Sequence, residues 1–231
     1  VGWRNPWLEH EQETPLQEAL AIGYAGLDSY GFHALETLQC MIERRVGGES
    51  GVAAVTCLEG DAVWQAAQAG HWPRDLAEAA VAAIQEKPDR PFEKLFGHPA
   101  LFLLEHKDGF RSAVLMATGA HAPLQTFAYA ARLDGAMRAC EVHLPNEPHA
   151  HFSYLSLNVE EMFLTGKPAW PVERTLLTTG VLEALLDSRH QGHVRLTTPH
   201  LAIAYRSYTH VPWRPTGPRP VGAALQPLPM P

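Results

Sequence analysis

The spacing of hydrophobic positions divides the first half of the chain into short strands and amphipathic helices. Over residues 29–45 the apolar side chains recur every three or four positions, which is typical of a helix with one buried face. Two glycines follow at 47 and 48 and end it. The stretch 51–58 (GVAAVTCL) is apolar and rich in β-branched residues, which favours a strand. The pattern also predicts a strand over 16–23 and a helix over the Ala-rich stretch 76–86.

The clearest local signal is a hairpin over residues 100–117. Two apolar runs, ALFLLEH and FRSAVLMA, flank the sequence Lys107-Asp108-Gly109. Asp-Gly supplies the positive φ angles that a tight turn requires. Further strands are predicted over 126–133 and 138–144.

The last third of the chain begins with two helices. The first covers 153–165, with Leu155, Val159, Met162 and Phe163 on one face, and Gly166 ends it. The second begins at Pro171, where a missing N–H costs nothing, and runs to about residue 189. Short strands over 193–197 and 201–205 and a proline-rich tail over 211–231 complete the predicted elements.

This order of elements predicts an α+β fold with a predominantly antiparallel open sheet and helices packed on one face. An apolar sheet face left bare in solution is unfavourable, so we expect a second copy of the chain to cover the other face in a homo-oligomer. We expect one domain over 16–210, carrying a helical excursion over 61–98. A leading loop over 1–15 and the tail over 211–231 lie outside it.

Composition narrows the possible partners. The 231 residues are 46% hydrophobic and 19% charged, which is typical of a globular protein. The net charge is −7 and the 18 Lys and Arg are scattered, so we expect no nucleic-acid partner. No apolar run approaches the ~18 residues that span a bilayer, so we expect no membrane association. Three widely separated cysteines without metal-ligand spacing favour a reducing, cytoplasmic location.

Thirteen histidines invite a metal interpretation. His149 and His151 would point the same way on a strand, and His190 and His193 lie three residues apart at a helix end. A zinc site requires three or four ligands with supporting carboxylates. Pairs arise by chance among so many histidines, so we expect no metal site, and a metal-dependent hydrolase is the weakest hypothesis.

Three stretches, in the expected order, resemble the carboxy-terminal domain of the glucose–fructose oxidoreductase / inositol dehydrogenase / MocA family. Residues 31–36 (GFHALE) look like the family's G-x-H-x-x-D helix start. Residues 100–119 are similar to its hairpin of two apolar strands. Residues 160–188 (EEMFLTGKPAWPVERTLLTTGVLEALLDS) look like its carboxy-terminal helix pair. The resemblance covers roughly residues 16–205.

The resemblance implies a domain that binds substrate and forms oligomers through its sheet. In the family, an amino-terminal Rossmann domain binds NAD or NADP, and the substrates are often sugars, polyols or their derivatives. A lysine of that Rossmann domain acts together with the histidine that His33 matches. The chain begins at Val1 and has no glycine-rich dinucleotide loop, so we expect it to be the substrate side of a larger enzyme, inactive alone.

The chain departs from the family pattern beside His33. Family dehydrogenases often place an aspartate four residues before the histidine, where this chain has Ser29, with Asp28 one residue further away. The acidic residue three positions after the histidine is Glu36 rather than aspartate. These departures leave open a second hypothesis, a non-catalytic binding or scaffold module.

His33 is the predicted catalytic residue, because an imidazole can move the hydroxyl proton of a secondary alcohol near neutral pH. The alternative is that His33 only packs or caps its helix. Asp28, Ser29 and Tyr30 are the predicted substrate-binding neighbours. For Asp28 or Ser29 a helix-capping role is the favoured alternative, and Tyr30 could equally be a packed aromatic residue.

Overall fold

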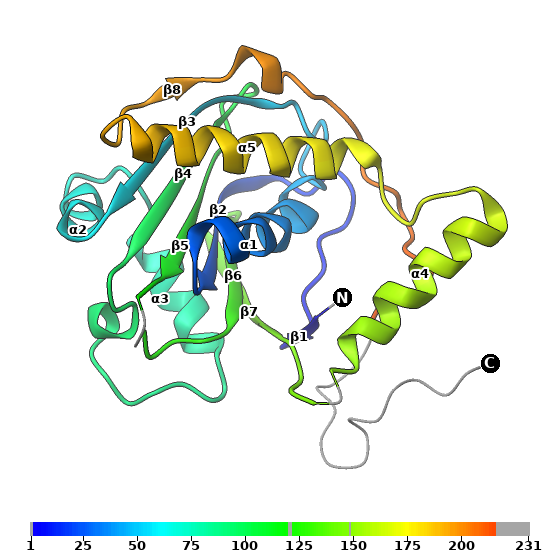
Figure 1. Cartoon of the computed structure of the whole chain (residues 1–231), viewed down its shortest axis with the longest axis horizontal. Helices are drawn as coiled ribbons and strands as arrows, with labels where there is room; N and C mark the ends of the chain where they lie inside the picture. Colours follow the sequence, from blue (N-terminus) through cyan, green and yellow to red (C-terminus); the bar gives the residue numbers. More distant parts are fainter. Residues whose placement is uncertain (1, 120–121, 148, 216–231) are drawn as a thin grey trace.

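The computed structural model describes residues 2–119, 122–147 and 149–215. They form a mixed sheet of eight strands in the order β1-β7-β6-β2-β5-β4-β3-β8, in which β2 and β5 are parallel and the other neighbours are antiparallel (Figure 1). The strands are β1 (Trp3–Asn5), β2 (Leu16–Tyr24), β3 (Val52–Glu59), β4 (Ala100–His106), β5 (Arg111–Ala117), β6 (Phe127–Leu133), β7 (Ala136–His143) and β8 (Leu196–Thr197).

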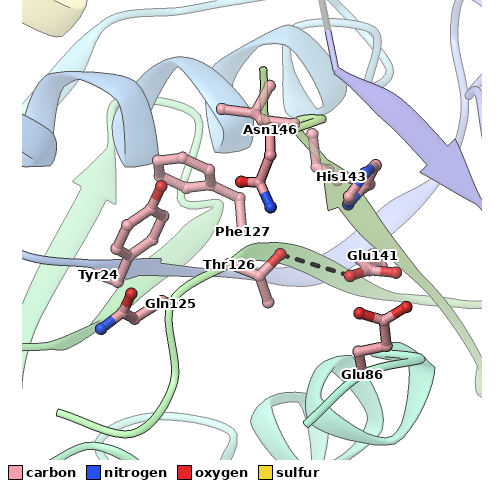
Figure 2. A pocket seen from close by; sticks show the side chains of 10 residues that line it. Tyr24, Glu86, Gln125, Thr126, Phe127, Glu141, His143 and Asn146 are labelled. Atoms are coloured by element: carbon pink, nitrogen blue, oxygen red, sulfur yellow. Dashed lines mark hydrogen bonds between the residues drawn. The ribbon is translucent and has the colours of Figure 1, made fainter. Parts of the chain in front are cut away.

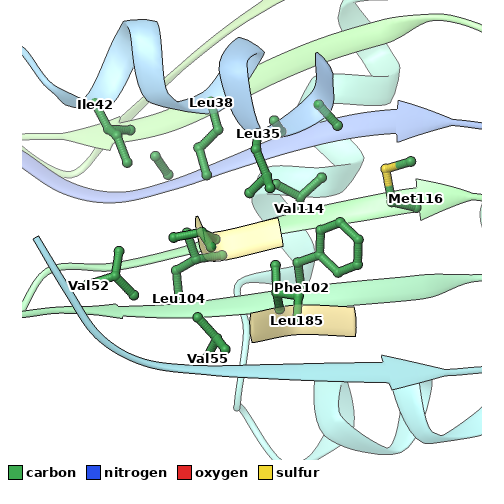
Figure 3. Packing of buried hydrophobic residues seen from close by; sticks show 14 of the residues in the cluster. Leu35, Leu38, Ile42, Val52, Val55, Phe102, Leu104, Val114, Met116 and Leu185 are labelled. Atoms are coloured by element: carbon green, nitrogen blue, oxygen red, sulfur yellow. The ribbon is translucent and has the colours of Figure 1, made fainter. Parts of the chain in front are cut away.

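Helices α1 (Leu27–Ile42) and α5 (Val172–His190) cover one face of this sheet. Figure 3 shows Leu35 and Leu38 of α1 directed at the sheet, where they belong to the main hydrophobic cluster together with Val114 of β5 and Phe102 of β4. Gly31 lets the two helices approach closely, because a Cβ there would lie 3.0 Å from Leu182 of α5 and 3.3 Å from Phe102. The glycine that opens the G-x-H stretch therefore serves packing.

Helices α2 (Asp61–Gln68) and α3 (Arg74–Ala83) and the short 3-10 helix η1 (Phe92–Leu95) lie over the opposite face. They bury Leu20, Ile22 and Leu115 of the central strands in a second cluster. The α+β class and the open, mostly antiparallel sheet are confirmed, but helices cover both faces rather than one. The excursion over 61–98 thus buries the face that we expected a second copy to cover.

Most predicted elements are present, with ends shifted by a few residues. The hairpin is confirmed, and Gly109 in its turn has a φ of 86°. Helix α2 was not predicted, and the predicted strand over 201–205 is instead a 3-10 helix, η2 (Pro199–Leu201), followed by one isolated bridge between Glu49 and Tyr205. The predicted tail lies outside the described residues from 216 onward.

Helix α4 (His151–Thr165) lies beside the sheet rather than over it (Figure 1). Most of its predicted apolar face is not buried, since Val159, Met162 and Phe163 are 41%, 36% and 79% exposed. Asn158 connects α4 to the segment that contains Trp213, because its amide donates to the carbonyl of Trp213 at 2.6 Å.

A candidate binding site at one edge of the sheet

The predicted site residues lie at the start of α1, directly after β2. Strands β2 and β5 are parallel and end together at Tyr24 and Ala117. Ligands of α/β sheets commonly bind beyond the carboxyl ends of parallel strands. The first turns of α1 therefore lie at an edge suited to a ligand.

His33 lies on the exposed side of α1. Its ring contacts the ring of Tyr30 with centroids 5.7 Å apart, and the ring of Phe32 at 5.9 Å. Within the described parts of the chain, no hydrogen bond joins the imidazole to another side chain. The ring is accessible and is oriented by aromatic contacts rather than by a carboxylate.

Asp28 and Ser29 do not have the predicted capping role. The capping position is Gly26, which precedes the helix and has no side chain that could cap it. Ser29 instead donates from its hydroxyl to the carbonyl of Gly26 at 3.4 Å. Asp28 is exposed in the first turn, where a carboxylate is favoured by the positive end of the helix dipole. Both polar groups face solvent beside Tyr30.

Glu36, the acidic residue three positions after His33, faces α5. Its Oε1 accepts a hydrogen bond from the hydroxyl group of Thr178 at 2.7 Å. Burial raises the pKa of the Glu36 carboxyl, although the nearby Arg174 opposes that shift. This residue connects α1 to α5 and does not lie with His33.

Tyr30 connects the predicted residues to a group of aromatic side chains. Its ring lies parallel to that of Phe127 at 6.4 Å with an interplanar angle of 8°, and 5.0 Å from the ring of Tyr24. Tyr24 and Phe127 also contact each other, with centroids 4.9 Å apart. Burial raises the pKa of the Tyr24 hydroxyl, which keeps this group protonated and able to donate.

Tyr24 and Phe127 line a hollow of about 170 Å³ at the same edge (Figure 2). Glu141 of β7 forms part of its wall and is only 2% exposed. The hydroxyl of Thr126 lies 3.5 Å from Oε1 of Glu141. The remaining lining residues are Glu86, Gln125, Val142, His143, Leu144 and Asn146.

The sequence analysis did not identify this hollow. Glu141 carried one signal, since a carboxylate lies there in a strand between Cys140 and Val142. Glu86 follows α3 and gave no signal in the sequence, because only the folded excursion brings it to the start of β6. Of the four predicted residues, Tyr30 alone contacts the side chains that line the hollow.

The described residues show no cluster of metal ligands, and an acidic side chain lies where the turn into α1 would meet a phosphate. The turn from β2 into α1 is a strand-to-helix connection beside the parallel strand pair, but Asp28 in the first turn would repel a pyrophosphate. No three His, Cys, Asp or Glu side chains gather as metal ligands in the described ranges. The rings of His149 and His151 lie 6.0 Å apart, and His149 has a φ of 57° next to the start of α4.

Comparison with known proteins adds no assignment. The chain matches no protein-family model, and no curated protein matches it. In the ranges that the structure describes, no helix has the length and apolar character needed to cross a membrane.

Proposed function

We propose that this chain is the substrate-binding domain of an NAD- or NADP-dependent oxidoreductase that acts on a secondary alcohol of a sugar-like or cyclitol-like molecule. The resemblance of three ordered stretches to the glucose–fructose oxidoreductase / inositol dehydrogenase / MocA family supports it. In this proposal the dinucleotide is bound mainly by a separate nucleotide-binding domain, and the protein is cytoplasmic.

The observation that carries the proposal is the position of Tyr30. Its ring contacts the ring of His33. It also contacts the rings of Tyr24 and Phe127, which line the hollow. A titratable imidazole and a polar hollow thus lie at the same sheet edge. A bound polyol could place hydroxyl groups in the hollow while one secondary alcohol reaches His33.

In this arrangement His33 acts as the acid–base group. A neutral imidazole accepts the proton of the substrate hydroxyl during oxidation and returns it during reduction. The nicotinamide supplies the hydride acceptor or donor when it is bound. Asp28, Ser29 and Tyr30 offer exposed groups that can hydrogen-bond to the substrate around His33.

A second function is a non-catalytic binding module. Two observations favour it. Ser29 stands where the family has a carboxylate, and no described side chain hydrogen-bonds to the His33 ring. Such a protein would retain the hollow and bind a ligand without turnover.

His33→Ala in the full-length product of the gene separates the two functions. The exposed His71 provides a matched control, His71→Ala. Turnover is followed as a change in NADH or NADPH absorbance over a panel of polyols, and dinucleotide binding is measured separately. We expect His33→Ala to lower kcat by roughly 100-fold or more, as expected for loss of a general base, with dinucleotide binding retained. A parent protein without turnover on any member would support the binding module.

A further inference from the structure

One side of helix α4 is held by the rest of the domain, and the other side is exposed. On the inner side, the ring of Tyr154 meets the ring of Trp3 edge-on, with centroids 5.5 Å apart. Asn158, one turn further along, is 2% exposed, and its Oδ1 accepts the backbone N–H of Trp213 at 3.3 Å. No other described helix packs along α4 (Figure 1). The inner contacts therefore determine which side of the helix faces outward.

The outward side carries an apolar seam with the spacing of a coiled coil. Its four members are separated by three, four and three residues, like the a and d positions of two heptads. Phe163, next to the last of them, is 79% exposed and widens the seam. Such a seam packs against a second helix at a shallow crossing angle. The members of the seam are Phe152, Leu155, Val159 and Met162.

A membrane surface does not suit this helix. Helices that lie on membranes carry Lys and Arg on their polar side, which attract anionic headgroups. Helix α4 contains neither residue type, and its acidic residues are Glu160 and Glu161. The occupant that fits the seam is a helix with a matching seam, and a second copy of the chain supplies one.

The seam matches itself when two copies of α4 run antiparallel. A two-fold axis at the middle of the helix sets Phe152 opposite Met162 of the second copy. It also sets Leu155 opposite Val159 of the second copy, so every layer joins an a position to a d position. Because a two-fold interface uses the same surface of both chains, each pairing occurs twice.

The charges around α4 also favour the antiparallel order. Glu160 and Glu161 then lie beside the N-terminal half of the second helix, which is the positive end of its dipole. A parallel pair would instead gather four carboxylates at one end. Exposed Glu147 precedes α4 and exposed Lys167 follows it, so the antiparallel order brings these opposite charges to the same end of the pair.

We propose that the protein forms a two-fold homodimer in which the seams of two antiparallel α4 helices pack together. This interface is not the sheet face expected from the sequence, which α2, α3 and η1 bury. The proposal goes beyond the proposed function and does not rest on it.

The size of the surface defines the expected strength. The seam and Phe163 expose roughly 400 Å² of apolar surface in each copy, if a whole aromatic side chain offers about 200 Å². With its polar rim the pair would bury about 1,000 Å², at the lower limit for specific interfaces. Small interfaces are typical of weak complexes, so we expect a dissociation constant in the roughly micromolar range.

The test is sedimentation equilibrium of the full-length protein over a wide range of concentrations. We expect the mass to rise from that of one chain to that of two. Phe152→Lys and Met162→Glu each place a charge in the seam and should weaken association at least ~10-fold, because the dimer would bury that charge. Val46→Glu, at another apolar position that is 59% exposed, is the matched control and should associate like the parent. Thermal unfolding of every variant shows that it is folded.

A mixture of the two seam variants tests the orientation. In an antiparallel pair with one copy of each, the introduced lysine meets the introduced glutamate, and the unchanged Met162 and Phe152 meet in the other layer. We expect the mixture to associate at least ~10-fold more tightly than either variant alone. In a parallel pair the lysine would face Phe152, and mixing would restore nothing.

Four results would overturn this inference. The first is a full-length protein that remains a single chain at every concentration, and the second is seam variants that associate like the control. The third is a mixture that associates no more tightly than its components. The fourth is a dimer that forms only after removal of residues 216–231, because that segment would then be the occupant of the seam.

Discussion

The guanidinium group of Arg174, near the start of α5, lies with its Nε 2.8 Å from Oε2 of Glu43, the residue that follows α1. Both side chains are buried, with 10% and 1% of their surface exposed. The hydroxyl of Tyr205 donates to the same oxygen at 2.8 Å. This ion pair joins α1 to α5, and the hydroxyl of Tyr205 connects both helices to the segment that follows β8.

Arg174→Met should lower the free energy of unfolding by about 3–5 kcal/mol, because it leaves the buried Glu43 carboxylate without its cation. Urea unfolding measures this loss. The control is Arg195→Met, which breaks the exposed pair of Arg195 with Glu105. We expect that change to cost less than ~1 kcal/mol. Equal losses in the two variants would show that Arg174 does not compensate a buried charge.

The stability of the protein should fall between pH 6.5 and about 4 because of His10. Burial lowers the pKa of His10 from 6.5 to about 4, and the charges of Arg4 and Arg44 add to the shift. Below pH 6.5 the unfolded chain binds a proton there that the folded protein does not yet bind. This contribution to stability is therefore complete above pH 6.5 and is lost as the pH falls, by about 3 kcal/mol in total.

His10→Asn should reduce this pH dependence. Unfolding free energies at pH 7 and pH 4.5 give the slope for each protein, and His71→Asn at an exposed position is the control. The difference between the two slopes isolates His10 from other titrating groups. Identical slopes in both variants would contradict the assignment.

The serine that ends the stretch resembling the family helix pair has a structural role. Ser188 is fully buried, and its Oγ accepts the backbone N–H of Cys57 in β3 at 3.0 Å while donating to the carbonyl of Val194 at 2.5 Å. Ser188→Ala leaves both backbone groups without this partner, which should cost about 1–3 kcal/mol of unfolding free energy.

Chemical unfolding of Ser188→Ala against Ser156→Ala provides the measurement. Ser156 is exposed on α4, where alanine should have no cost because it is the better helix former. A variant at 188 as stable as the one at 156 would mean that other groups or water satisfy the Cys57 N–H and the Val194 carbonyl.

Local signals were sufficient to predict most of the elements. The Asp108-Gly109 turn with apolar runs on both sides defined its hairpin, and the spacing of Leu35 and Leu38 defined the buried face of α1. Local signals could not predict that helices would cover the second face of the sheet. Whether α3 folds over the second face depends on contacts between residues far apart in sequence, such as those of the excursion with Leu20 and Leu115.

The candidate site was predictable only in part, for the same reason. His33 and Tyr30 are close in sequence, so helical spacing brought them together. The hollow combines β2, β6, β7 and the segment after α3, which only the folded sheet makes neighbours. Residues that match the family pattern could have either a functional or a structural role. Gly31 allows close packing of α1, and Ser188 hydrogen-bonds to the backbone within the fold.

Substitutions of Tyr30 test whether His33 and the hollow lined by Tyr24 and Phe127 act on the same ligand. Tyr30 is 36% exposed, and its ring stacks on that of Phe127. Tyr30→Phe keeps the ring contacts and removes only the hydroxyl. In the full-length protein we expect kcat/KM for the polyol to fall about 10-fold, the loss of roughly one hydrogen bond to the substrate, with an unchanged free energy of unfolding.

Tyr30→Ala also removes the ring that connects His33 to the hollow. We expect a larger fall in kcat/KM together with weaker ligand binding by NMR, and a loss of about 1 kcal/mol in stability from the aromatic contacts. Tyr208→Phe, at another exposed tyrosine, is the control. If Tyr30→Phe turns over substrate like the parent while Tyr30→Ala does not, the ring positions the site and its hydroxyl does not touch the substrate. If both variants match the parent, the hollow and His33 do not act on one ligand.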